Sequence, residues 1–128
     1  MNVNAPISVG ELIDKLTILE IKLAEIADCE KLGNVKREYE TLLAVAPDGL
    51  LARGEVSALR EKLKAVNAEL WLIEDELRAK ERSRVFDEAF IALARAVYLT
   101  NDKRAALKRE INTLSQSEFV EEKSYAAY

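Results

Sequence analysis

Residues 56–77 read VSALREKLKAVNAELWLIEDEL, in which an apolar side chain recurs every three or four positions. This spacing places the apolar side chains on one stripe of an α-helix, which turns once in about 3.6 residues. The stripe is formed by Val56, Leu59, Leu63, Val66, Leu70, Ile73 and Leu77. Such an unbroken stripe predicts a long helix over residues 55–82 that packs lengthwise against another helix.

A second long helix is predicted over residues 87–112, and one of its faces changes chemistry halfway along. At steps of three and four, this face reads first Phe86, Phe90, Leu93 and Val97, and then Asn101, Arg104, Lys108 and Asn112. We expect the apolar part to lie in the core and the polar part to form a cluster at one end of it. Because burying a charge is costly unless it is paired, another part of the fold or a bound ligand must neutralise this cluster.

Two shorter helices are predicted before the long ones. Ser8 and Glu11 have the spacing of a capping box, which predicts that a helix over residues 8–27 begins here. Apolar residues at helical spacing predict another helix over residues 30–46, which Pro47 ends.

These elements predict an all-α fold, an antiparallel bundle of about four helices with a short C-terminal tail. Short connections favour antiparallel neighbours, and 128 residues suit one domain, 1–128. On the first helix, Ile18 and Ile21 form a second apolar strip away from the main seam. A third helix or a second subunit should cover this strip, so we expect a homo-oligomer, most simply a dimer.

The composition bounds the classes of function. Acidic and basic residues are intermixed and the net charge is −4, which argues against nucleic-acid binding. No signal peptide and no apolar segment long enough to span a membrane is present, so we expect a soluble, cytoplasmic protein without a membrane partner.

The chain has no histidine and one cysteine, Cys29. Zinc sites built from Cys and His, and nucleophiles activated by His, are therefore not available. We expect no metal and no cofactor, and the sequence assigns no catalytic residue. An enzyme of this composition would work with carboxylates, Lys, Arg or Tyr.

A set of polar and aromatic residues forms the candidate ligand site. In this hypothesis Arg104 and Lys108 hold a carboxylate or phosphate, asparagines orient it, and Trp71 and Tyr98 form an apolar wall. Glu20 or Glu74 would act as general acid or base in an enzyme. The full set is Glu20, Asn67, Trp71, Glu74, Arg78, Tyr98, Asn101, Arg104, Lys108 and Asn112.

The alternative interpretation of the same residues is structural. Glu20 and Glu74 would neutralise Arg104 and Lys108, which would leave a polar layer that fixes the register of the helices. Both interpretations are open at this point.

Four segments of the chain resemble a family of short bacterial proteins known only as a domain of unknown function. They are APISVGELIDKLTILEIK (5–22), VNAELWLIED (66–75), VYLTNDKRAALKREIN (97–112) and EEKSY (121–125). The resemblance implies a helical bacterial protein and implies no reaction. A looser similarity links the chain to the all-helical chorismate mutases, whose bundle helices hold a dicarboxylate with Arg and Lys. This chain has Glu20 in place of their basic residues on the first helix.

The sequence as a whole predicts a non-catalytic binding or interaction protein whose polar cluster holds a small anionic metabolite. One alternative is a cofactor-free enzyme acting on a carboxylated or phosphorylated small molecule, with chorismate-mutase-like chemistry by analogy only. The other is a helical interaction scaffold without a ligand.

Overall fold

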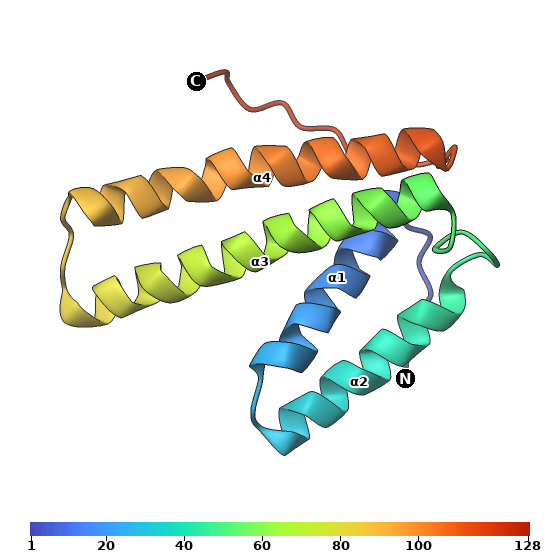
Figure 1. The fold of residues 1–128 in the computed structure, drawn as a ribbon, viewed down its shortest axis with the longest axis horizontal. Helices are drawn as coiled ribbons and strands as arrows, with labels where there is room; N and C mark the ends of the chain where they lie inside the picture. The colour runs from blue at the N-terminus through green and yellow to red at the C-terminus, as the bar shows by residue number, and fades with distance from the viewer.

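The computed structural model describes all 128 residues and contains four α-helices and no strand. The helices are α1 (Val9–Glu25), α2 (Cys29–Val45), α3 (Gly54–Ser83) and α4 (Glu88–Leu114) (Figure 1). Each begins and ends close to the predicted residues, and the predicted all-α fold is confirmed.

Side-chain caps define where three of the helices begin. The backbone N–H of Glu11 donates to Ser8 Oγ, and Asp28 and Asp87 accept in the same way at the starts of α2 and α4. Each cap satisfies one of the backbone N–H groups that the first turn leaves without a partner. The capping box at Ser8 is only half formed, because the Glu11 carboxylate pairs with Lys15 and Lys108 instead.

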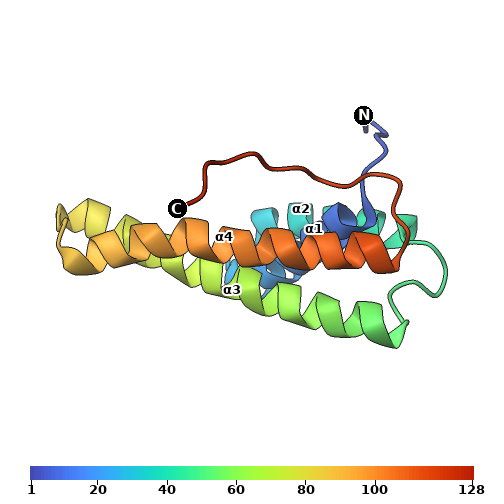
Figure 2. The same ribbon diagram turned by 90° about the horizontal axis from the view of Figure 1, so that it is seen from above.

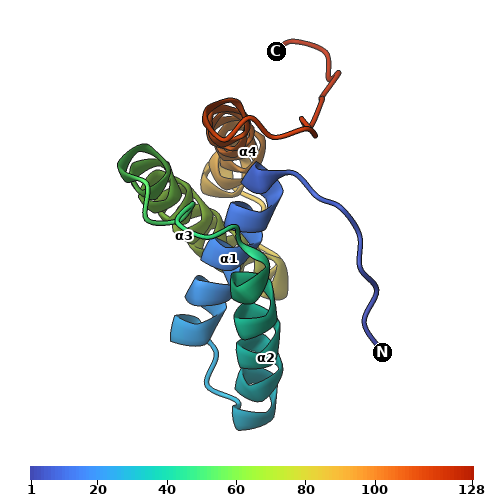
Figure 3. The same ribbon diagram turned by 90° about the vertical axis from the view of Figure 1, so that its right-hand side faces the viewer.

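The two long helices α3 and α4 form an antiparallel hairpin, and α1 packs against both of them (Figure 1). Helix α2 contacts α1 and no other helix. Seen along the hairpin, α1 therefore lies between the hairpin and α2 (Figure 3). The arrangement is a bundle in which only one half of the hairpin has a second layer.

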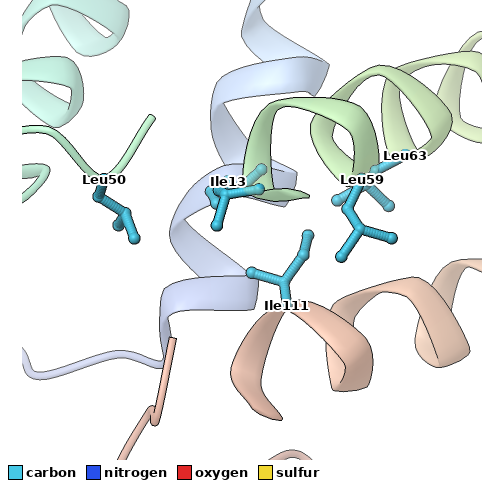
Figure 4. Packing of buried hydrophobic residues seen from close by; sticks show 6 residues of the cluster. Ile13, Leu50, Leu59, Leu63 and Ile111 are labelled. Atoms are coloured by element: carbon cyan, nitrogen blue, oxygen red, sulfur yellow. The ribbon is translucent and has the colours of Figure 1, made fainter. Parts of the chain in front are cut away.

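The apolar core lies where α1 meets the start of α3 and the end of α4. A cluster of buried residues fills this junction, and Leu50 from the loop before α3 closes one side of it (Figure 4). The cluster consists of Ile13, Leu50, Val56, Leu59, Leu63 and Ile111. This junction holds the N-terminal helix against the hairpin.

The other half of the hairpin, residues 70–100, is called the distal half here. It projects beyond α1 and α2 when the molecule is seen from above (Figure 2). Helix α1 has 17 residues, a length of about 25 Å, and it crosses the hairpin at an angle. It reaches only the start of the distal half, where Ile18 lines a cavity with Leu70 and Trp71.

The predicted core position of the apolar stripe on α4 is therefore wrong in part. Phe86 is 53% exposed, and Phe90, Leu93 and Val97 are only half-buried. The polar half of the same face is the half that α1 covers, and there Lys108 and Asn112 are buried. The expected order along this face, apolar in the core and polar at its edge, is reversed.

None of the four helices combines the length and the apolar character that crossing a membrane requires.

Candidate functional site

The centre of the polar cluster is the carboxylate of Asp14, on the second turn of α1. Arg104 Nε on α4 donates to Asp14 Oδ1 over 2.9 Å, and Arg104 Nη2 donates to Asp14 Oδ2. This two-point contact between a guanidinium and a carboxylate is the strongest geometry for such a pair. Asp14 is 1% exposed, so the pair joins α1 to α4 inside the fold.

Helix α3 joins the same network through Asn67. Its Nδ2 donates to Asp14 Oδ1 and to Thr17 Oγ1, both over 2.9 Å. The hydroxyl of Thr17 in turn donates to the backbone carbonyl of Asp14 over 2.8 Å. Three helices thus meet at one buried acid, and no buried polar side-chain atom of the chain is left without a hydrogen-bond partner.

The charged state of Arg104 is stabilised by this contact. Its hydrogen bonds to Asp14 raise the pKa of Arg104 above the usual value, against the opposing effect of burial. The remaining guanidinium nitrogen, Nη1, lies 3.5 Å from Asn101 Oδ1, at the limit of a hydrogen bond.

Lys108 lies one turn further along α4 and is also paired. Its Nζ lies 2.8 Å from Glu11 of α1 and 2.9 Å from Glu121 of the C-terminal tail. Burial works against the ammonium form of Lys108, but the hydrogen bonds to Glu11 and Glu121 outweigh it and raise the pKa of Lys108. The hydrogen bond from Lys108 in turn lowers the pKa of Glu121.

The start of α1 touches the end of α4 at Gly10. The backbone N–H of Gly10 donates to Asn112 Oδ1 over 2.7 Å, and both residues are buried. A Cβ on Gly10 would lie 2.6 Å from the carbonyl oxygen of Lys108 and 2.9 Å from Asn112 Oδ1. Only glycine lets the two helices approach this closely, and the approach brings Glu11 and Asp14 within reach of the α4 cations.

The predicted pairing of Arg104 and Lys108 with Glu20 and Glu74 is wrong. Glu20 pairs with Arg60 over 3.2 Å and with Lys64 over 3.7 Å, both on α3. Glu74 pairs with Arg78, one turn away on the same helix. The acids that neutralise the two α4 cations are Asp14, Glu11 and Glu121.

A signal for Asp14 was present in the sequence. Gly10, Asp14, Thr17 and Ile21 recur on α1 at steps of four, three and four, and all of them are buried. On such a face the glycine permits close approach of another backbone, and the acid and the hydroxyl call for polar partners. The pattern therefore indicates a close, polar contact with another helix. The predicted second strip, Ile18 and Ile21, lies partly on this face.

The predicted site residues do not share one pocket. Five of them, Asn67, Trp71, Glu74, Arg78 and Arg104, line a cavity of about 420 Å³. Tyr98 and Asn101 line a second cavity, of about 880 Å³, between α4 and the tail, and Lys108 and Asn112 line a third, of about 260 Å³. Glu20 lies apart, in its own ion pairs on α3.

These contacts define a small all-α protein in which a buried ion-pair layer holds the N-terminal helix against one half of a long helical hairpin. The chain belongs to a family of unknown function, DUF6165, whose model matches residues 1–128. The family resemblance of the sequence is thereby confirmed. No curated protein and no solved structure matches the chain.

Proposed function

We propose that this protein is a helical interaction protein that pairs with a second copy of itself through the distal half of the α3–α4 hairpin. The observation that supports this role is the reversal along the face of α4. Its polar part is covered and paired by α1, whereas in its apolar part Phe86 is exposed and Phe90, Leu93 and Val97 are only half-buried.

A second copy is the partner that suits this face. Two helical hairpins that pack face to face form a four-helix bundle, which gives each hairpin the second layer it lacks. The contact would be symmetric, with the same patch on both copies. The α4 part of the distal half has a length of about 20 Å, comparable to a short bundle.

The charges beside the apolar stripe suit a symmetric contact. Glu74 and Arg78 form an exposed ion pair on the α3 part of the distal half, so this half carries both signs of charge. A copy related by a twofold axis can then place acids of one chain near bases of the other.

The pairing of the core cations argues against a metabolite bound at Arg104. Such a ligand would have to replace Asp14, which is 1% exposed and is held by Arg104 and Asn67. Catalysis there would need a free acid or base, and the acids beside Arg104 and Lys108 are engaged in ion pairs. We therefore place the scaffold role ahead of an enzyme and of a metabolite bound in the core at Arg104.

We place this interaction in a bacterial cytoplasm, without nucleic acid or membrane as partner. The exposed free thiol of Cys29 suits a reducing compartment. The net charge of −4 gives no electrostatic attraction to a phosphate backbone.

The test is the mass of the full chain in solution. Sedimentation should give twice the 14.4 kDa of the chain at micromolar concentration. Phe90→Glu, in the middle of the apolar stripe, should give a monomer with unchanged helical content. Leu43→Glu introduces the same charge on α2, outside the distal half, and should leave the dimer intact. A wild-type chain that sediments as a monomer would refute the proposal.

A further inference from the structure

The residues after α4 turn back and run along this helix towards its middle (Figure 2). We call residues 119–128 the C-terminal strap. Every residue of the strap is exposed, and a cavity of about 880 Å³ separates its last residues from α4. Apolar packing therefore contributes little to holding the strap in place.

Charged and polar contacts attach the strap to α4. Glu121 lies 2.9 Å from Lys108, and Glu122 lies 2.9 Å from Arg109. At the end of the strap, the Tyr128 hydroxyl donates to Asp102. The ring centroids of Tyr128 and Tyr98 lie 5.3 Å apart. Of the groups that receive the strap, only the Lys108 side chain is buried, with 8% of its surface exposed.

The helices present an excess of positive charge where the strap attaches. Three cations of α1 and α4 lie here, Lys15, Lys108 and Arg109. Glu11 is the one helical acid that pairs with any of them, and it pairs with Lys15 and Lys108. Arg109 pairs with Glu122 of the strap. The strap brings two further acids, Glu121 and Glu122, together with Lys123. Without the strap, a buried lysine and a neighbouring arginine would face solvent with a net positive charge.

We propose that Glu121 and Glu122 occupy an anion-binding site formed by Lys108 and Arg109, called the seat here, and that a small dianion, a phosphate or a dicarboxylate, binds there by displacing the strap. The seat is distinct from the core pair of Arg104 and Asp14, and it does not depend on the self-association proposed above. A dianion replaces the charge of the two strap acids, and Lys108 and Arg109 offer it ammonium and guanidinium donors.

The space around the seat accommodates such a ligand. A cavity of about 260 Å³ lies against it, lined by Lys108, Arg109, Asn112 and the strap residues Glu121 and Lys123. Lys123 also lines the larger cavity, whose walls include Tyr98, Tyr125 and Tyr128. A ligand larger than phosphate therefore has room to extend along α4 beside aromatic side chains.

The experiment follows the backbone amide resonances of the full chain by NMR during titration with sodium phosphate and, separately, sodium succinate. Sodium chloride at matched ionic strength is the control, because salt alone weakens exposed ion pairs. Phosphate or succinate should move the resonances around Lys108 and shift those of the strap to unstructured positions, at concentrations where chloride does not. The dianion that acts at lower concentration identifies the ligand class.

Matched variants test the competition. Glu121→Gln removes the carboxylate that occupies the Lys108 side of the seat and should lower the dissociation constant for the effective dianion by about tenfold, the effect of one charge-assisted hydrogen bond. Glu118→Gln, in the same tail but without an ion pair, should leave that constant unchanged. Lys108→Met and the milder Arg109→Gln should both weaken binding, so a folding defect in the first variant does not remove the test.

Two results would overturn the proposal. One is release of the strap by chloride as readily as by phosphate and succinate at equal ionic strength. The other is a dissociation constant that Glu121→Gln leaves unchanged. The first result would show that salt releases the strap by screening its ion pairs, and the second that the dianion does not compete with Glu121. Neither result would bear on the proposed dimer of the distal half.

Discussion

Arg104 on α4 donates from Nε to the carboxylate of Asp14 on α1 over 2.9 Å, and Asp14 is 1% exposed. The two residues are 90 positions apart in the sequence, and their contact ties the N-terminal helix to the hairpin. Asn67 adds α3 to the same acid. This pair, with Asn67, links α1 to the half of the hairpin that α1 covers.

The first prediction tests this pair. Asp14→Leu leaves the half-buried guanidinium of Arg104 without its partner and should lower the free energy of unfolding by about 3 kcal/mol. Asp14→Leu combined with Arg104→Leu removes both charges and should lie within about 1 kcal/mol of the wild type. Urea unfolding followed by circular dichroism measures both values.

Glu20 provides the control for this prediction. Its partners are Arg60 and Lys64, so adding Glu20→Leu to Arg104→Leu should not restore stability. Recovery in that double variant would mean that Glu20, and not Asp14, neutralises Arg104 in solution.

The second prediction concerns the close approach of α1 and α4. Gly10→Ala places a Cβ 2.6 Å from a backbone carbonyl oxygen and should destabilise the fold by about 2 kcal/mol, despite the better helix propensity of alanine. Gly33→Ala, inside α2, meets only the flexible Arg37 side chain at 3.7 Å and should stabilise the fold by about 0.5–1 kcal/mol. Thermal unfolding of the two variants should therefore shift in opposite directions. Equal shifts would contradict the packing described for Gly10.

The third prediction concerns Thr17, which is fully buried. Thr17→Val keeps the shape of the side chain but removes the hydroxyl, which accepts from Asn67 Nδ2 and donates to the Asp14 backbone carbonyl. The loss should be about 1–3 kcal/mol of unfolding free energy. Thr41→Val removes a similar bond to the backbone, from Thr41 to the Arg37 carbonyl, on an exposed surface, and should change stability by less than about 0.5 kcal/mol. Comparable losses of unfolding free energy in the two variants would mean that the buried Thr17 hydroxyl contributes no more to stability than the exposed Thr41 hydroxyl.

The fourth prediction is a pH dependence of the strap. The hydrogen bond with Lys108 lowers the pKa of Glu121 below its usual value of 4.5. A lowered folded-state pKa means that the contact stabilises the attached strap above pH 4.5, and that this contribution is lost as the pH falls through the folded-state pKa. The raised pKa of Lys108 keeps this partner charged throughout the range, Lys123 also pairs with Glu121, and Glu11 is the other acid on Lys108.

The measurement is the chemical shift of the strap amides between pH 7 and pH 3. They should keep their folded positions down to about pH 4.5 and move to unstructured positions below it. In Glu121→Gln they should be displaced already at pH 7. A strap that detaches near neutral pH in the wild type would contradict the assignment to Glu121.

The sequence by itself determined the helices and the family. Apolar side chains at steps of three and four located α3 and α4, and the capping box at Ser8 located the start of α1, because both signals lie within one helix or one turn. It also located Arg104 and Lys108 as charges that need partners, since they share a face with Leu93 and Val97.

Only the tertiary structure decided which acids meet those charges and which part of the α4 face is covered. Helical spacing gives the angular position of a side chain on its own helix, but it gives neither the crossing angle nor the axial offset between two helices. Glu20 lies about 9 Å further along α1 than Asp14, and either acid was compatible with the pattern of α4. The close approach at Gly10 sets the offset, so Asp14 meets Arg104, and the short α1 leaves Phe86 exposed and Phe90 only half-buried.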